Sequence, residues 1–240
     1  MVKAVALDID GTITRPDGTI PPESWGAIRE LEENGIKVIL VSGNAICVLL
    51  GLRHYSGATG AAIGENGGVI FYNDRIYILG RKANVLERAR KLIIEELGDI
   101  LEESVQNRYR HVDYAFKSKD PNIDRRIISE KIGMILKRHG LEGLEVLDSG
   151  VAFHVHEHGI SKGIGLEKAC ELMGISPRDV VAIGDSEVDL SLFEKAGKSI
   201  AVGNAIPELK KRADIVLEEE YYKGFLRAVN FILENLIGDY

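Results

Sequence analysis

The sequence predicts an α/β fold, in which a parallel sheet forms the core and a smaller α/β unit is inserted into that core. Near the start and near the end of the chain, short runs of branched apolar residues alternate with helical patterns. This order is typical of a buried parallel sheet with right-handed crossovers. Between these two stretches the strands have only one apolar face. Because buried strands return afterwards, we expect the middle segment to be an inserted domain.

The core is expected to comprise residues 1–81 and 159–240. Apolar runs predict strands at 2–8, 36–41 and 60–64, then at 180–185, 199–202 and 215–217. Helical spacing predicts helices at 24–34 and 45–54 and a closing helix with an apolar stripe from Phe225 to Leu236. Asn73-Asp74, between short strands at 69–72 and 75–79, indicates a hairpin.

The inserted domain is expected to span residues 82–158, with two helices on one face of a small sheet. The predicted elements are a helix at 85–97, a one-sided strand at 112–116, a helix that opens at Asp120-Pro121, and strands at 144–147 and 151–155. The second helix has apolar residues at spacings that favour burial, namely Ile123, Ile127, Ile132 and Ile135.

Composition and charge narrow the possible functions. The chain has 240 residues, 45% of them hydrophobic and 28% charged, with a net charge of −7. The proportions are typical of a globular protein, and the acidic balance argues against a nucleic-acid or anionic-membrane partner. Cys47 and Cys170 lie far apart in sequence, so we expect two reduced thiols in a cytoplasmic protein, with a disulfide as the alternative. No apolar stretch is long enough to span a bilayer.

Polar side chains follow three of the predicted buried strands. They are Asp8 and Asp10 after the first strand, Ser42 and Gly43 after the second, and Asp185 and Asp189 after a later one. Lys162 stands just before another helical stretch. Because the carboxyl ends of parallel strands meet at one edge of a sheet, we expect these groups to converge there.

Each of these signals has a second interpretation when taken alone. The pair Asp8 and Asp10 is also typical of a solvated turn, and Ser42 is typical of a helix N-cap. Asp185 and Asp189 could cap and charge the amino terminus of a helix, and Lys162 could be a surface lysine. The presence of all four signals in one chain, three of them at strand ends, favours a common site.

The chemistry that suits this set is phosphoryl transfer. Carboxylate oxygens bind Mg²⁺ where phosphate is also a ligand. A metal ion and a lysine neutralise the transferring group, while a hydroxyl and backbone N–H groups hold its oxygens. One carboxylate can attack phosphorus, and a second can protonate the leaving oxygen and then activate water.

Four segments in this order resemble the motifs of the haloacid dehalogenase superfamily of phosphatases. They are Asp8-Ile9-Asp10-Gly11-Thr12, Ser42-Gly43-Asn44, Lys162, and Gly184-Asp185-Ser186-Glu187-Val188-Asp189. The resemblance implies a Rossmann-like parallel sheet core and an inserted α/β cap domain that sets substrate specificity. The insertion point is similar to that of the sucrose-phosphate-phosphatase-like subfamily, and the compact cap resembles that of archaeal phosphoglycolate phosphatases.

The resemblance also implies roles for the acidic residues. Asp8 would be the nucleophile and Asp10 the general acid and base. Asp8, the backbone carbonyl of Asp10, and Asp185 would hold Mg²⁺, and Asp189 would complete or orient this set of ligands.

Ser42, Gly43 and Lys162 would bind the phosphoryl group of the substrate. One position departs from the family pattern, because many relatives have Asn where this chain has Val188. A polar contact of those relatives is therefore missing or supplied from elsewhere.

Two further groups stand out in the inserted domain. His154, His156 and His158 alternate along a predicted strand, and we expect them to be half-exposed or near the substrate, with a transition-metal site as the less favoured alternative. For the basic cluster Arg108, Arg110 and His111 we favour a solvated edge over recognition of an acidic leaving group.

The expected function is therefore Mg²⁺-dependent hydrolysis of a small phosphorylated metabolite through an aspartyl-phosphate. The resemblance favours 2-phosphoglycolate, with a sugar phosphate as the alternative substrate and a phosphorylated receiver or binding protein as the non-enzymatic alternative. A homodimer is left open, and no nucleic-acid or membrane partner is expected.

Overall fold

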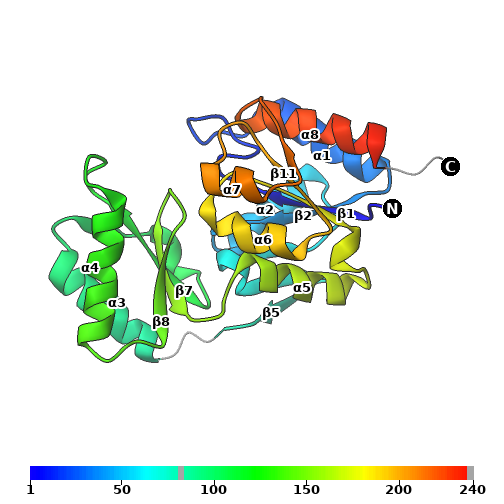
Figure 1. Cartoon of the computed structure of the whole chain (residues 1–240). Helices are drawn as coiled ribbons and strands as arrows, with labels where there is room; N and C mark the ends of the chain where they lie inside the picture. Colours follow the sequence, from blue (N-terminus) through cyan, green and yellow to red (C-terminus); the bar gives the residue numbers. More distant parts are fainter. Residues whose placement is uncertain (81–83, 237–240) are drawn as a thin grey trace.

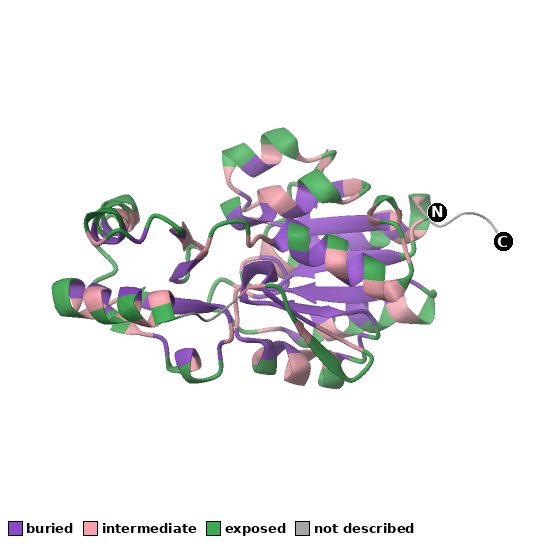
Figure 2. Cartoon of the chain, turned by 90° about the horizontal axis from the view of Figure 1, so that it is seen from below, coloured by how far each residue is buried: buried purple, intermediate pink, exposed green. Residues whose placement is uncertain are grey.

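The fold is that of a computed structural model, which describes residues 1–80 and 84–236. It contains a larger and a smaller sheet, and Figure 1 shows the smaller sheet, with α3 (Asn84–Leu97) and α4 (Arg125–Arg138), beside the larger one. Buried residues follow the strands of the larger sheet (Figure 2). In the described part of the chain, no helix has the length and apolar character needed to cross a membrane.

The larger sheet has eight strands, six of them parallel to one another. The strands are β1 (Ala4–Asp8), β2 (Lys37–Val41), β3 (Ala62–Gly64), β4 (Val69–Tyr72), β5 (Arg75–Ile78), β10 (Val180–Gly184), β11 (Lys198–Ala201) and β12 (Ile215–Val216). Their order is β12-β11-β10-β1-β2-β3-β4-β5. The strands from β12 to β3 pair in parallel, and β4 and β5 add an antiparallel hairpin at one edge. β1 therefore lies in the middle of the sheet, between β10 and β2.

Helices cover both faces of the larger sheet because its central strands are apolar on both faces. The helices are α1 (Pro22–Glu33), α2 (Ile46–Ser56) and α8 (Tyr221–Asn235) on one face, and α5 (Lys162–Met173), α6 (Leu190–Lys195) and α7 (Pro207–Arg212) on the other. The alternation is visible in β1, where Val5 and Leu7 join one apolar cluster while Ala4 and Ala6 join the other.

The smaller sheet is antiparallel and has one covered face. Its strands are β6 (Leu101–Glu103), β7 (Asp113–Ser118), β8 (Leu144–Asp148) and β9 (Phe153–Glu157), in the order β6-β7-β9-β8. α3 and α4 pack on one face around the buried Phe116 and Phe153. The opposite face is turned toward the larger sheet (Figure 1).

Most predicted elements are present with bounds shifted by a few residues. The hairpin turn has Asn73 at φ 49° and Asp74 at φ 56°, the left-handed conformations that a type I′ turn requires. Cys47 and Cys170 are free thiols, so the alternative of a disulfide is wrong. The short strand β6 was not expected from the sequence.

The second helix of the smaller sheet begins later than predicted. The side chain of Asp120 accepts a hydrogen bond from the backbone N–H of Asn122 in a local turn, and Asp124 caps α4 by accepting from the N–H of Arg126. The burial prediction is therefore wrong in part. Ile127 is 47% exposed, while the next residue, Ile128, is buried.

The division into a core of residues 1–81 and 159–240 and an inserted domain of 82–158 stays a prediction. Its first boundary, at residues 81 and 82, lies outside the described residues. Its second boundary falls between β9, which ends at Glu157, and α5, which begins at Lys162. We refer to the unit of α3, α4 and the smaller sheet as the cap, and to the remainder as the core.

Candidate active site

The site lies at the carboxyl ends of three neighbouring central strands. Asp8 is the last residue of β1, Ser42 follows β2 directly, and Asp185 follows β10 directly. β1 pairs with β2 in a register that sets Asp8 beside Val41, so the two strands end level. The predicted convergence of these side chains at one edge of the sheet is present.

Lys162 is the first residue of α5 and one of the most buried polar groups in the site. Its side chain is 2% exposed, and its ammonium lies 2.6 Å from Asp8 Oδ1 and 2.7 Å from Asp189 Oδ1. Burial by itself would lower the pKa of Lys162, but Asp189 and Asp8 outweigh it and raise the pKa above its usual value. The alternative of a surface lysine is wrong.

Asp189 has both carboxylate oxygens occupied by hydrogen bonds. Oδ1 accepts from Lys162, whereas Oδ2 accepts from the backbone N–H groups of Asp185 and Ser186 and from the Ser186 hydroxyl. The residue therefore caps, together with Ser186, the 3₁₀ helix Glu187–Asp189 that follows β10, in line with the alternative interpretation, and it also fixes the ammonium of Lys162. These bonds favour an orienting role for Asp189.

Three carboxylates form a cluster that could hold a cation. Asp8, Asp185 and Asp189 each offer one oxygen, and these oxygens lie within 4.8 Å of one another. Burial and the other two carboxylates raise the pKa of Asp8 against the opposing effect of Lys162. Burial, and next the charge of Asp189, raise the pKa of Asp185 to about 7. One lysine does not neutralise three acidic groups, so a hard divalent cation would fit here.

Small residues and hydroxyls shape this acidic cluster. Thr12 donates a hydrogen bond to Asp8 Oδ2 at 3.0 Å, and the Asn204 amide donates to the carbonyl of Gly11 and to Asp185 Oδ2. Gly11 has φ +86°, and a Cβ atom there would lie 2.2 Å from Asp185 Oδ2. Only glycine allows Asp185 to approach the β1 loop this closely.

Asp10 is exposed, and its carboxylate turns away from the acidic cluster. Its Oδ2 accepts hydrogen bonds from the Asn44 amide at 2.9 Å and from the Ser42 hydroxyl at 3.4 Å. Asn44 in turn accepts from the side chain of Gln106, which belongs to the cap. The side chain of Ser42 does not cap α2, whose N-cap is Ala45, so the helix-cap alternative is wrong. Hydrogen bonds through Asn44 thus link Asp10 to Gln106 of the cap.

A buried charged group on the cap faces the same site. Arg110 donates to both oxygens of Asp113, at 2.9 and 3.0 Å, and to the carbonyl of Gly43 at 2.9 Å. Asp113 Oδ2 also lies 2.8 Å from His154 Nδ1. Burial would raise the pKa of Asp113, but Arg110 and His154 hold it at about 2. Burial lowers the pKa of His154 despite Asp113, so the ring is neutral near pH 7 and donates its Nδ1–H to Asp113.

Two expectations for the cap are therefore corrected. The prediction of a solvated edge is wrong for Arg110. The residue is 6% exposed because its guanidinium forms an ion pair with the buried Asp113. Half-exposure is wrong for His154 and His156, which are 2% and 1% exposed on the face of β9 that looks toward the core. His158 lies beyond β9 and is exposed. Among the described residues, no histidine joins a candidate metal cluster.

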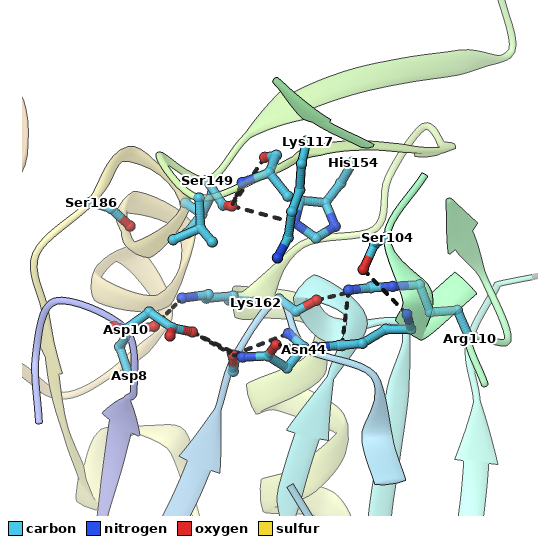
Figure 3. Close-up of a pocket in the computed structure, with 16 residues that line it drawn as sticks. Asp8, Asp10, Asn44, Ser104, Arg110, Lys117, Ser149, His154, Lys162 and Ser186 are labelled. Atoms are coloured by element: carbon cyan, nitrogen blue, oxygen red, sulfur yellow. Dashed lines mark hydrogen bonds and ion pairs between the residues drawn. The ribbon is translucent and has the colours of Figure 1, made fainter. Parts of the chain in front are cut away.

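Core and cap together enclose a cavity of about 70 Å³ (Figure 3). The core lines it with Asp8, Asp10, Ser42, Gly43, Asn44, Lys162, Ser186 and Val188, and the cap with Ser104, Gln106, Arg110, Lys117, Ser149, Val151, Ala152 and His154. The volume is small beside the ~300–1,000 Å³ of common ligand pockets, which favours a small substrate. Val188 is 7% exposed and contributes an apolar wall.

The sequence did not single out Gln106, Lys117 or Ser149 as site residues. Gln106 is the only glutamine of the chain, but its position in a 3₁₀ turn gives no pattern that points to the site. Lys117 had a usable signal, since it continues the polar side of the one-sided strand predicted at 112–116.

Comparison with protein-family models matches residues 5–137 and 146–229 to the haloacid dehalogenase-like hydrolase family. Over 233 residues, or 95% of this chain and 96% of the relative, the chain is 38% identical to a phosphoglycolate phosphatase of Methanoculleus marisnigri. Over 238 residues, or 98% of this chain and 97% of the relative, it is 35% identical to phosphoglycolate phosphatase 1 of Saccharolobus solfataricus.

Solved structures share the fold. The crystal structure of Thermoplasma acidophilum 0175 superposes with a TM-score of 0.82 at 27% identity and covers 99% of this chain and 100% of that one. A haloacid dehalogenase-like hydrolase from Bacteroides thetaiotaomicron, at 20% identity, superposes with a TM-score of 0.79 and covers 97% of this chain and 100% of that one. The predicted fold class, a Rossmann-like parallel core with an added α/β unit, is confirmed.

Proposed function

The chain belongs to the haloacid dehalogenase-like hydrolases, and from that premise we propose that it is a Mg²⁺-dependent phosphatase that hydrolyses 2-phosphoglycolate to glycolate and phosphate. One observation carries the proposal. Asp8 lies at the base of a small cavity with one carboxylate oxygen 2.6 Å from Lys162, while Asp10 lies beside it with its carboxylate exposed. Two carboxylates with such different surroundings suit two different tasks. The names of the relatives support the choice of substrate.

The reaction divides into two displacements at phosphorus. In the first, an Asp8 carboxylate oxygen bonds to phosphorus while the bond from phosphorus to the glycolate oxygen breaks, and Asp10 donates a proton to that oxygen. In the second, Asp10 takes a proton from water, whose oxygen attacks phosphorus and displaces the Asp8 carboxylate. The products are glycolate, inorganic phosphate and the regenerated enzyme.

The other site residues hold the phosphoryl group and its charge. The Ser42 hydroxyl, the Gly43 backbone and the Lys162 ammonium would bind its oxygens. Mg²⁺ would be held by the carboxylates of Asp8 and Asp185, and it would neutralise charge that develops on the transferring group.

Asp189 and the backbone carbonyl of Asp10 complete the proposed metal-binding group. Asp189 would act by orienting Lys162 and the turn that carries Asp185, since both of its oxygens already accept hydrogen bonds.

We also place this enzyme in the cytoplasm, a location supported by the two free thiols of Cys47 and Cys170.

Steady-state release of phosphate tests the proposed function. With Mg²⁺, we expect the chain to hydrolyse 2-phosphoglycolate faster than glucose 6-phosphate, because the cavity is small. Asp8→Asn should abolish turnover, and Asp10→Asn should slow both displacements by about 10²–10⁴-fold, the usual contribution of general acid–base catalysis. Turnover that survives Asp8→Asn contradicts the covalent route.

A preference for the sugar phosphate would reassign the substrate to the alternative, and a stable phosphorylated chain without turnover would indicate a receiver. Glu30→Gln, on the exposed side of α1, is the matched carboxylate control and should not change the rate.

A further inference from the structure

Three basic side chains line the cavity, and two of them already have anionic partners. Lys162 contacts Asp8 and Asp189, and Arg110 contacts Asp113. Within the described residues, the side chain of Lys117 forms neither a hydrogen bond nor an ion pair, although its backbone pairs in β7. A bound anion would find in Lys117 the one basic group of the described cavity lining that is not shared with a carboxylate.

The position of Lys117 follows from the alternation of β7. Tyr114 and Phe116 point into the apolar cluster beneath α3 and α4. Asp113, Ala115 and Lys117 therefore point to the opposite face, which looks toward the core. Figure 3 shows the Lys117 side chain extending from the cap strand with its nitrogen directed into the cavity, above Lys162.

The sheet holds the backbone of Lys117 in place. Lys117 pairs with Glu102 of β6, and its neighbour Phe116 pairs with Phe153 of β9. Glu102 is the carboxylate directly opposite Lys117, yet it is exposed and no ion pair joins the two. The ammonium is thus presented from a rigid strand and is not neutralised by its cross-strand neighbour.

The two ends of the cavity differ in what they can bind. The core end holds the cation site and the phosphoryl-binding group around Asp8. The cap end presents an ammonium group and the hydroxyl of Ser149. A second anionic group on the substrate, on the side of the leaving oxygen, would face the cap end.

We infer that Lys117 is a specificity-determining residue that binds the carboxylate of the leaving group. The inference rests on the proposed function, because it assumes that phosphate esters bind with phosphorus at Asp8. According to this inference, Lys117 alone lets the enzyme distinguish an acidic leaving group from an uncharged one of equal size. Arg110 instead serves to hold Asp113, His154 and the Gly43 carbonyl in position.

A pair of substrates that differ mainly in the carboxylate tests this inference. We would measure kcat/KM for 2-phosphoglycolate and for ethyl phosphate with the unmodified chain, Lys117→Met and Lys131→Met. Lys131 is exposed on α4 outside the cavity, so it is a control with the same loss of charge. Lys117→Met should lower kcat/KM for phosphoglycolate by about 10- to 100-fold, the value of a hydrogen bond to a charged group, and leave ethyl phosphate within about twofold.

Charge reversal gives a second test that a misfolded variant cannot pass. Lys117→Glu should lower kcat/KM for phosphoglycolate further and raise it for O-phosphoethanolamine, whose leaving group is cationic. Equal losses on all substrates, or a preference for phosphoglycolate that survives in Lys117→Met, would overturn the role of Lys117.

The two proposals fail in different ways. An unmodified chain that releases phosphate from no phosphomonoester contradicts the proposed phosphatase function. An unmodified chain that hydrolyses ethyl phosphate as readily as phosphoglycolate contradicts the recognition of a carboxylate, while the phosphatase function stands.

Discussion

Glu65 is a fully buried carboxyl group where the core meets the cap. It follows β3, and its Oε2 accepts hydrogen bonds from the backbone N–H groups of His111 and Val112 at 2.7 and 2.8 Å. Its Oε1 is buried and has no hydrogen-bond partner among the described residues. Burial, followed by the charge of Asp113, raises the pKa of Glu65 to about 7, against the opposing effects of the two N–H groups and Arg110. The carboxyl group is therefore more easily protonated in the folded chain.

The raised pKa of Glu65 predicts how its contribution to stability depends on pH. Its folded pKa of about 7 exceeds the ordinary value of 4.5 for a glutamate, so between these two values the folded state binds the proton more tightly than the unfolded state. The free energy of unfolding should then fall as pH rises through this window, by an amount on the order of 3 kcal/mol for this residue. Glu65→Gln should remove that part of the slope, because the amide oxygen can still accept both N–H groups and no charge is buried.

Urea unfolding from about pH 5 to about pH 8 measures this slope. Asp185 adds a slope of the same sign, so the informative quantity is the difference between the unmodified chain and Glu65→Gln. Glu30→Gln, on the exposed side of α1, is the matched control and should keep the full slope. An identical slope in Glu65→Gln and the unmodified chain would show that Glu65 does not bury a charge on titration.

At the scale of single elements, the start of α5 depends on a turn from a different part of the chain. Gly67 has φ +104°, and a Cβ atom there would lie 1.9 Å from the carbonyl oxygen of Ser161. A Cβ on Gly165 would in turn lie 2.7 Å from the Cα of Gly67. The turn at Glu65–Gly67 therefore packs against the residues that position Lys162, and glycine is needed on both sides of this contact.

Gly67→Ala tests whether the contact between this turn and α5 positions Lys162. The left-handed conformation alone costs an alanine ~1–2 kcal/mol, and the clash with Ser161 must add to that cost. We expect the variant to lose more unfolding free energy than this conformational cost alone. We also expect a lower kcat, because the start of α5, which carries Lys162, has to move. Urea unfolding and steady-state kinetics give the two readouts.

Gly18→Ala is the control for this prediction. Gly18 has φ +81° with no atom within 4 Å of an added Cβ, so the variant should show only the conformational cost and an unchanged kcat. Equal behaviour of the two variants would mean that the contact between the turn and α5 does not position Lys162.

Elements were predictable from sequence where local patterns decide them. The buried strands β1, β2 and β10 are short apolar runs that end in Asp or lead directly into Ser or Asp, and parallel topology then brings their ends together. The start of α4 was misjudged because Asp120-Pro121 and Asp124 offer two N-terminal signals, and only the second cap forms. The three-residue strand β6 has no periodicity of its own and exists because β7 pairs with it.

The cap side of the site was less predictable because its partners are brought together by sheet register. The pairing of β7 with β9 places Asp113 near His154, which is 41 residues away in sequence. Arg110 was expected in a solvated basic cluster although Asp113 stands only three residues away, because the burial of Asp113 depends on the sheet. No local pattern in the sequence reports that burial or the contact with His154.

At the scale of the whole molecule, the cap has an apolar core of its own. Its buried cluster draws only on residues between Leu86 and Val155, whereas the clusters on the two faces of the larger sheet draw almost entirely on the core. Most links between the two units are polar, among them Glu65 to the N–H groups of His111 and Val112, and Gln106 to Asn44. One is apolar, because the side chain of Val112 joins the buried cluster of the core. Local opening of the cap should therefore leave the larger sheet folded.

Ile132→Ala tests the independence of the two units. Ile132 is fully buried in the cap cluster, so the cavity should cost about 2–5 kcal/mol of stability within the cap. By hydrogen exchange, we expect faster exchange in α3, α4 and β7 and unchanged protection of β1 and β10. Mg²⁺ should raise the protection of β1 and β10 in this variant as in the unmodified chain, because its proposed ligands Asp8 and Asp185 belong to the core.

Ile39→Ala is the reciprocal control, since Ile39 is equally buried in β2 of the larger sheet. It should weaken protection of β1 and β10 while α3 and α4 keep their own. If Ile132→Ala accelerates exchange equally in both sheets, the molecule opens as one cooperative unit, and the polar contacts around Glu65 and Gln106 couple the cap to the core more strongly than their small number implies. Separate opening would instead mean that the cap can move while the phosphoryl-binding residues stay assembled, so Lys117 could reach the leaving group without disturbing Asp8.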